Sequence, residues 1–325
     1  MRRAPIDRAW RCGCSILAVP ELNWMRRDWL KLLALLLPVL TGCLSHTRKL
    51  QQPKLAGAVM NADAIELVEA INKRYDEINS LTATVDFAAS VGGTHTGKQT
   101  DYTSFHGFIL FRKPKMLRVI GEVPVIRTIA FNLASNGDTF TLLIPHYSKA
   151  IQGSSSVTTR AANPIENLRP STFLDSIVIQ RITPDRIVSL INSSSNTVEP
   201  RTKQLIETPQ YDLTISKAGN PSSPSGLPQV DKPLRVVHFS RINLMPTEQD
   251  IYNANGDVET QVIYGPYQDF NGTQYPATIT INRLLDEYRI TLTVEKLVLN
   301  PTNPPLTDKS FELEIPKGYK VQKMP

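Results

Sequence analysis

The sequence is poor in cysteine and in long apolar runs, and both absences limit what the chain can be. Its 325 residues include three cysteines, Cys12, Cys14 and Cys43. The chain beyond Cys43 therefore holds no disulfide framework, so an ordinary hydrophobic core must stabilise it. It also holds no thiol nucleophile. Beyond residue 42 no apolar stretch reaches the ~20 residues of a membrane-spanning helix, so we expect a soluble, tethered body.

Charge and catalytic motifs are also scarce. The whole chain has a net charge of +6, but residues 1–42 hold seven of its Lys and Arg residues and three of its Asp and Glu residues. Residues 43–325 therefore hold 29 basic and 27 acidic residues. This near-neutral body argues against a nucleic-acid partner. The sequence lacks a Gly-x-Ser-x-Gly elbow, a Gly-rich phosphate loop and a His-x-x-x-His pair. We therefore expect no enzyme, no cofactor and no metal site, with a hydrolase as a remote alternative.

The five histidines are expected to be structural rather than ligands. They are isolated from one another along the chain: His46, His95, His106, His146 and His238. No two of them have the close helical spacing of a metal site. Similarly, Asp286-Glu287 after two leucines predicts a charged turn rather than an acid–base pair.

The one long apolar run ends in a tetrapeptide typical of bacterial prolipoproteins. Residues 32–40 are apolar and follow the basic segment 25–31, and Leu40-Thr41-Gly42-Cys43 matches a lipobox. The run is too short to span a bilayer. We therefore expect cleavage before Cys43, acylation of Cys43 with chains such as palmitate, and stable anchoring in membrane lipid. A plain secretory signal is the alternative.

This leader defines the expected organisation of the chain. Residues 1–24 lie upstream of the signal and are interpreted as an over-long gene start, with translation beginning at Met25. Residues 25–42 are the predicted signal peptide, 43–60 a flexible tether and 61–325 a single domain. Leu44 replaces the aspartate that retains some lipoproteins in the inner membrane, which favours the outer membrane, facing the periplasm.

An amphipathic helix is predicted at the start of the domain. Asp63 followed by Glu66 predicts a capping box at its N-terminus. Apolar residues then recur at three- and four-residue spacing, which is typical of one buried helix face: Leu67, Val68, Ile71, Tyr75 and Ile78.

From residue 81 the apolar residues alternate, which predicts half-buried strands. In the first half the pattern includes residues 81–89 and short runs around Phe108, Leu117, Ile129–Leu133 and Phe140–Ile144. In the second half, strands are predicted at residues 205–216, 234–239, 250–253, 258–264, 277–282, 290–299 and 311–315. Tight turns are predicted at Lys113-Pro114-Lys115, Asn136-Gly137-Asp138, Asn255-Gly256 and Asn271-Gly272.

Helical and polar stretches interrupt the strands. Residues 164–178 are predicted to be helical, in two short pieces because Pro170 interrupts them. A further helical piece is expected near residues 184–191. Residues 218–233 are predicted to be a polar loop within a hairpin. Together the patterns predict a mainly β with α (α+β) fold around one antiparallel sheet that is curved or barrel-like.

The order of these elements resembles the LolA/LolB lipoprotein-localisation superfamily, and within it the outer-membrane lipoprotein-sorting-like bacterial lipoproteins. Local cues are Phe111-Arg112-Lys113-Pro114, Leu117-Arg118, Ser135-Asn136-Gly137-Asp138 and Ile144-Pro145. The resemblance covers most of residues 60–320. It implies a curved antiparallel half-barrel, with helices covering the open mouth and an apolar concave face that accommodates acyl chains.

The resemblance also implies candidate site residues. The expected cavity lining consists of concave-face apolar residues, namely Leu110, Leu117, Phe131, Phe140 and Leu142, although the alternate set that faces inward stays open. By position, Val123-Pro124-Val125-Ile126 matches the membrane-inserting loop of the receptor LolB; the alternative is a core-facing strand crossing. Tyr264, Tyr267, Phe270 and Tyr275 predict an aromatic-packed hairpin or a ligand rim.

Two functions are compatible with these patterns. The first is a non-enzymatic, monomeric outer-membrane lipoprotein that binds lipid or acylated cargo in the half-barrel, in lipoprotein or lipid trafficking. The second is an envelope interaction or sensor lipoprotein that binds a peptide or protein partner, with residues 218–233 as the candidate surface.

Overall fold

The computed structural model describes residues 52–94, 96–124, 126, 128–155, 164–217 and 232–324. The elements below belong to one unit, Pro53–Pro325. The lipobox, Cys43, His46, His95 and Val125 lie outside the described residues, as do residues 218–231 of the predicted polar loop.

Strands dominate the described residues. The helices are α2 (Ala64–Glu77) and α3 (Pro170–Ile177), with 3-10 turns η1 (Pro145–Tyr147), η2 (Pro164–Asn167) and η3 (Asp308–Phe311). The strands of the first half are β1 (Lys54–Leu55), β2 (Ser80–Gly93), β3 (Lys98–Arg112), β4 (Met116–Glu122), β5 (Ile129–Ser135), β6 (Thr139–Ile144) and β7 (Lys149–Ser154). Those of the second half are β8 (Arg186–Val198), β9 (Leu205–Lys217), β10 (Pro233–Ser240), β11 (Pro246–Tyr252), β12 (Val258–Tyr264), β13 (Tyr267–Phe270), β14 (Thr273–Pro276), β15 (Thr278–Arg283), β16 (Tyr288–Leu299) and β17 (Lys320–Lys323).

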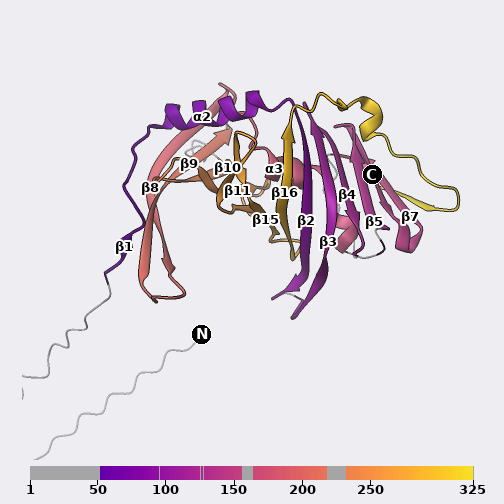
Figure 1. Cartoon of the computed structure of the whole chain (residues 1–325), viewed down its shortest axis with the longest axis horizontal. Helices are drawn as coiled ribbons and strands as arrows, with labels where there is room; N and C mark the ends of the chain where they lie inside the picture. Colours follow the sequence, from indigo (N-terminus) through magenta and orange to yellow (C-terminus); the bar gives the residue numbers. More distant parts are fainter. Residues whose placement is uncertain are drawn as a thin grey trace, which may run out of the picture. The chain divides into compact units, whose positions relative to one another are not determined.

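The described strands form one open sheet of 15 strands and a separate hairpin, β13–β14. The sheet order is β1-β9-β10-β11-β12-β15-β16-β2-β3-β4-β5-β6-β7-β17, with β8 on the outer side of β9 (Figure 1). Pairing is antiparallel except where β1 meets β9 and β17 meets β7. The α+β class and the largely antiparallel sheet are therefore confirmed.

The helix α2 forms where the sequence predicts it. Asp63 caps its N-terminus in a capping box with Glu66, as expected. Leu67 and Ile71 are buried on its inner face, against β9 and β10. Figure 1 shows α2 along one rim of the unit, above the ends of these strands.

The core occupies one face of the sheet. Its larger part combines the inward residues of β2–β7, β12, β15 and β16 with Phe173, Leu174 and Ile177 of α3. A smaller part lies between α2 and the strands β9 and β10. Because α3 packs its apolar residues onto β5 and β15, side chains fill this region of the inner face.

The predicted pair of helical pieces is confirmed: η2 ends at Asn167 and α3 begins at Pro170. The predicted turns at Asn136-Gly137, Asn255-Gly256 and Asn271-Gly272 are also confirmed, and each glycine has a positive φ. The hairpin expected around residues 218–233 is consistent with the antiparallel pairing of β9 and β10.

Three expectations were wrong. Residues 184–191 are not helical: 184–185 form a turn, and 186–191 are the first part of strand β8, which pairs along its whole length with β9. Residues 311–315 form no strand, because Phe311 ends η3 and residues 312–315 pair with no neighbouring strand. Finally, part of the predicted tether is bound to the sheet: β1 pairs with β9, and the amide of Met60 donates to the Arg241 carbonyl at 2.7 Å.

Candidate functional site

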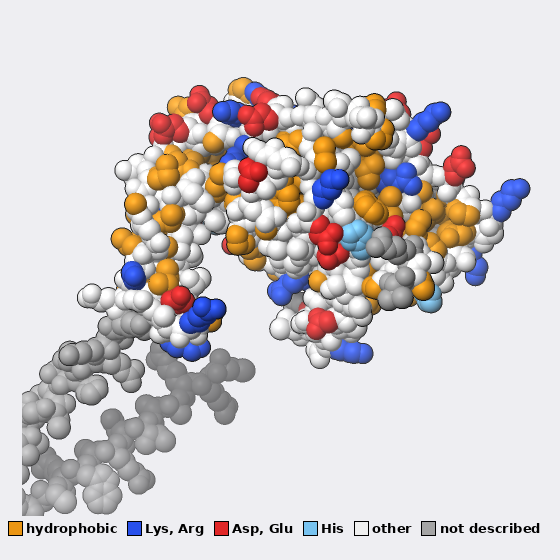
Figure 2. Space-filling view, in the orientation of Figure 1, with side chains coloured by type: hydrophobic (Ala, Val, Ile, Leu, Met, Phe, Trp, Pro, Cys, Tyr) orange, Lys and Arg blue, Asp and Glu red, His pale blue; other side chains and the backbone are white. Residues whose placement is uncertain are grey.

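A cavity of about 540 Å³ lies between α2 and the inner face of the sheet. It is bounded by α2, the end of α3, the β10–β11 turn and the β13–β14 hairpin. The residues that line it are mostly apolar or aromatic, and Figure 2 shows hydrophobic side chains gathered beneath α2. The apolar part of the lining includes Ala70, Ile71, Tyr75, Ile78, Ile177, Val178, Ile179, Phe239, Leu244, Tyr264, Tyr267, Tyr275 and Leu299.

The helix α2 contributes two cations and one carboxylate to this lining: Lys73 and Glu77, which are exposed, and Arg74, which is half-buried. Ile71, Arg74 and Ile78 share one helix face, because they are spaced by three and four residues. The half-buried Arg74 guanidinium lies 5.7 Å from the centre of the Tyr267 ring and donates to Met245 Sδ. Among the described residues it forms no ion pair. Arg74 therefore presents a half-buried positive charge at the wall of a space whose lining is mostly apolar.

Three tyrosines form the opposite wall, and they stay neutral. Burial raises the pKa values of Tyr264, Tyr267 and Tyr275 well above the ordinary range. The Tyr275 hydroxyl donates to the Ile177 carbonyl at 2.8 Å, and the Tyr264 hydroxyl accepts from Gln249 Nε2 at 3.1 Å. Because their polar ends are engaged in these bonds, Tyr264 and Tyr275 offer the cavity mainly the faces of their rings.

The aromatic cluster predicted near Gly265 includes a hairpin, which was one of its two alternatives. Tyr267 and Phe270 lie on β13, and Tyr275 lies on β14, so the cluster is a hairpin. The Phe270 and Tyr275 rings meet edge to face with centroids 6.4 Å apart. The hairpin also borders the cavity, through Tyr267, Gly272 and Tyr275.

Side chains from the sheet hold both ends of α2. Before its N-terminus, the Tyr211 hydroxyl accepts from the amide of Ala62 at 3.2 Å. At its C-terminus, Asn300 Nδ2 donates to the Glu77 carbonyl at 2.8 Å, and Lys113 Nζ donates to the Tyr75 carbonyl. The helix therefore covers the cavity as a strap that is fastened at its two ends.

The cavity residues expected from the resemblance lie elsewhere. Leu117, Phe131, Phe140 and Leu142 are buried side by side on the inner face and belong to the core. Leu110 lies on the opposite face, because the pairing of β3 with β4 sets Phe111, not Leu110, opposite Leu117. None of the five lines the cavity under α2, since α3 packs over the region where they meet.

The expected membrane-contact loop joins β4 to β5. Its described residues are Val123, which is half-buried, Pro124, which is exposed, and Ile126, whose exposed fraction is 67%. The Val123 amide donates to the Thr128 carbonyl at 2.8 Å, which closes the loop. Ile126 thus projects from a tight turn, and the alternative of a core-facing crossing does not apply to this side chain.

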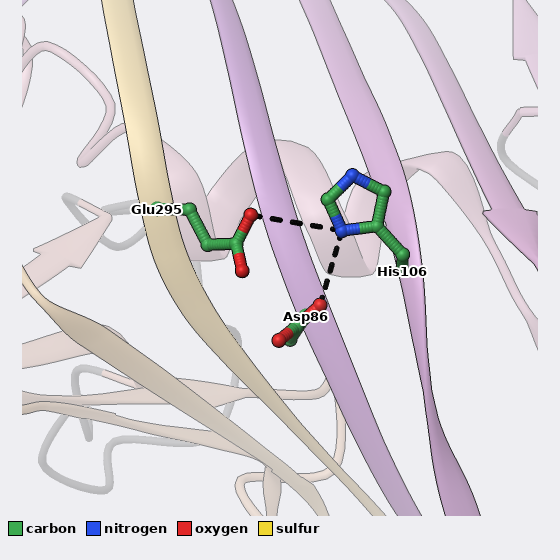
Figure 3. A group of neighbouring side chains, drawn as sticks. All are labelled: Asp86, His106 and Glu295. Atoms are coloured by element: carbon green, nitrogen blue, oxygen red, sulfur yellow. Dashed lines mark hydrogen bonds and ion pairs between the residues drawn. The ribbon is translucent and has the colours of Figure 1, made fainter. Parts of the chain in front are cut away.

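Two of the histidines lie among carboxylates from neighbouring strands. His106 Nδ1 faces both Asp86 (3.1 Å) and Glu295 (3.6 Å), from β2 and β16 (Figure 3). His238 lies among carboxylates of β9 and β11. Although burial alone lowers it, the facing carboxylates of Asp250 and Asp212 raise the pKa of His238 to about 9. No spacing in the sequence joins these residues; only the strand register does.

Comparisons with known proteins give likenesses in structure only. No family model and no curated protein matches the chain. A LolA superfamily protein from Nitrosomonas europaea matches with 15% identity and a TM-score of 0.45, over 76% of this chain and 97% of that one. The structure resembles those of LolA superfamily proteins.

Two further structures give the same degree of similarity. A putative outer membrane lipoprotein-sorting protein domain from Vibrio parahaemolyticus has 10% identity and a TM-score of 0.45, with 77% of this chain and 97% of that one covered. A DUF1329 family protein from Desulfovibrio piger has 12% identity and a TM-score of 0.44, with 77% and 95% covered. These likenesses are at low identity, and the function proposed below rests on this chain's own residues.

No helix among the described residues is both long and apolar enough to cross a bilayer.

Proposed function

We propose that this protein binds the acyl chain of a lipid or of an acylated ligand in the cavity under α2. The observation that carries the proposal is an apolar, aromatic-walled space of about 540 Å³ beneath a single helix. Its volume falls within the ~300–1,000 Å³ of sites that hold small ligands. The neutral tyrosines on its wall favour an uncharged, flexible hydrocarbon over a polar substrate.

Arg74 supports an anionic group at the ligand's end. Its guanidinium touches Tyr267 and Met245 and has no carboxylate partner among the described residues. A planar guanidinium binds phosphate or carboxylate through paired hydrogen bonds. We therefore place the headgroup at Arg74 and the hydrocarbon along Ile71, Ile78 and the tyrosines.

Transfer would use the hydrophobic effect and a moving strap. Each methylene that leaves water contributes about 0.8 kcal/mol, so a chain gains similar free energy in a membrane and in this cavity. The sheet would act as a half-barrel, with α2 and the β13–β14 hairpin over its mouth. Opening would separate α2 from β10 and from the hairpin while its fastened ends remain attached.

We further propose where the protein is located in the cell. Acylated Cys43 would anchor a monomer to the outer membrane, facing the periplasm, and the loop around Ile126 would contact the bilayer. The cargo would be a lipid or a lipoprotein in trafficking, with no catalytic step. The alternative partner surface, residues 218–233, falls mostly outside the described residues, and no observation favours it.

The direct test is native mass spectrometry with lipid extraction, on residues 44–325 exported to an envelope compartment without the anchor. We expect a stoichiometric acyl lipid or lipopeptide. A clean apo mass that is unchanged after incubation with lipids would contradict the proposal, and would favour the sensor function.

A matched pair of variants tests whether the ligand occupies this cavity. Ala70→Trp adds an indole to the lining of the cavity, whereas Glu69→Trp adds the same bulk at the neighbouring exposed position of α2. We expect Ala70→Trp to lower ligand occupancy at least tenfold and Glu69→Trp to leave it unchanged. Equal occupancy in both variants would place the ligand elsewhere.

A further inference from the structure

A second site candidate lies on the outer face of the sheet, opposite to α2. Val237 and Phe239 of β10 are buried against the helix, so His238 between them points to the other face. The register sets Asp212 of β9 and Glu248 of β11 directly beside His238. Asp250 lies on the same face, two residues further along β11.

The two nitrogens of His238 have different surroundings. Nδ1 lies 2.8 Å from Asp212 Oδ1, the distance of a charge-assisted hydrogen bond. Nε2 lies 3.6 Å from Asp250 Oδ2, and both Nε2 and Asp250 Oδ1 are buried atoms without a hydrogen-bond partner. Buried polar atoms are usually paired, so this pair of unsatisfied atoms calls for an explanation.

The side chains around His238 carry more negative than positive charge. Asp212, Glu248 and Asp250 surround one imidazole, and among the described residues none of the three forms an ion pair with a lysine or an arginine. Even with His238 protonated, three carboxylates leave an excess of negative charge that a divalent cation would neutralise.

We propose that His238 Nε2, Glu248 and Asp250 bind Zn²⁺, with Asp212 as the positioning residue for the imidazole. One ligand atom from each of the three residues lies within 4.8 Å of the others. One imidazole and two carboxylates form a donor set that Zn²⁺ accepts, with a fourth position open to water.

The surrounding contacts are those of a prepared site. The Asp212 carboxylate would keep a proton on Nδ1, so the metal would displace the proton on Nε2 and bind its lone pair. Ser193 Oγ donates to Asp212 at 2.8 Å, and Gln261 Nε2 donates to Glu248 at 2.7 Å, so both carboxylates are held in place.

The His106 cluster lacks this arrangement and serves as the control. Both of its carboxylates face the same nitrogen, Nδ1, and they are 47% and 46% exposed (Figure 3). An ordinary exposed ion pair accounts for that geometry.

The test is calorimetric titration of the full chain in detergent with ZnCl2, after treatment with EDTA and dialysis. We expect one Zn²⁺ per chain with a micromolar or lower Kd. His238→Ala and Glu248→Gln should each weaken binding at least tenfold, while His106→Ala should leave it unchanged. Circular dichroism before titration checks that each variant is folded.

Asp212→Asn separates the positioning role from ligation. Because Asn keeps the size of the side chain but not its charge, we expect a Kd about 10–100-fold weaker with the stoichiometry retained. Absence of Zn²⁺ binding in the parent chain, or equal Kd values in the parent and both ligand variants, would overturn the proposal. Neither result would bear on the acyl cavity, which lies on the other face.

Discussion

At the scale of single residues, two glycines decide how closely aromatic rings pack on the inner face. The rings of Phe87 and Phe105 stack with centroids 5.1 Å apart, and Phe131 meets both edge to face. Gly107 and Gly121 lie opposite each other on β3 and β4, beneath these rings. Their missing side chains leave the space that the three rings fill.

Replacing Gly107 by alanine tests this packing. A Cβ there would lie 2.2 Å from the Ile120 carbonyl oxygen and 2.5 Å from the Phe87 ring. We expect the free energy of unfolding to fall by about 1–3 kcal/mol, the usual cost of overpacking, as measured by urea denaturation.

The matched control is Gly57→Ala. Its Cβ would meet only the side chain of Ile242, with Cγ2 at 3.2 Å and Cδ1 at 3.6 Å, and no backbone atom. We expect a change within about 0.5 kcal/mol. Equal losses in the two variants would mean that backbone freedom, rather than contact with the rings, determines the effect.

Some site residues could be placed from the sequence, and others could not. Arg74 sits three residues after Ile71, so a helical wheel would have placed it on the apolar face. His238 gave no such signal. Its carboxylates are 26, 10 and 12 residues away in the sequence, and the register of three strands is needed to bring them together.

At the scale of elements, Asn300 joins the end of α2 to the start of β2 and the end of β16. Its Oδ1 accepts from the amides of Asn79 (2.8 Å) and Ser80 (3.0 Å), and its Nδ2 donates to the Glu77 carbonyl. Its φ of 49° is in the left-handed region, where asparagine is among the best-tolerated residues. One side chain thus fixes the point at which the strap leaves the cavity.

Asn300→Ala should loosen that end of the strap. We expect a loss of about 1–3 kcal/mol in unfolding free energy from the missing hydrogen bonds. Amide exchange at residues 79 and 80 should become faster. Asn255→Ala, in the exposed β11–β12 turn, is the control and should leave exchange at these amides as it was. Unchanged exchange in Asn300→Ala would show that Lys113 alone holds this end.

Elements were predictable where local signals and pairing agree. The capping box and periodicity of α2 specify a helix without reference to the rest of the chain. Residues 186–191 carry an apolar pattern that suits either state, and the ladder with β9 decides for a strand. Conversely, β17 is polar and exposed, and only its pairing with β7 makes it a strand.

At the scale of the whole unit, apolar surface gathers at places remote from the core. The most exposed large apolar side chains among the described residues are Ile126 (67%) and Ile65 (66%). Ile126 lies in the β4–β5 turn, whereas Ile65 lies at the start of α2. Isolated exposed apolar residues are normal, so membrane contact at Ile126 needs a direct comparison of the two.

Ile126→Glu should weaken binding of the anchor-free protein to vesicles of phosphatidylethanolamine and phosphatidylglycerol. Burying an isoleucine in lipid contributes about 1.5–3 kcal/mol, so we expect binding at least about tenfold weaker by co-sedimentation. Ile65→Glu removes the same side chain at equal exposure and should leave binding unchanged. Equal binding of Ile126→Glu and the parent would remove this loop from the proposed mechanism.

The pairing of β2 with β16 has a consequence for how the chain folds. Strands β2–β7 pair with their neighbours in chain order, and so do β9–β12, β15 and β16. The two series meet along the ladder of β2 with β16, which runs from Val91 opposite Tyr288 to Leu81 opposite Leu299. During synthesis the first series is complete long before its partner strand exists. The edge of β2 that later pairs with β16 therefore stays unpaired while nearly 200 further residues are synthesised. Closure of this long loop would govern the folding rate, and the nascent chain would be most vulnerable to wrong strand pairing just before its last long strand emerges.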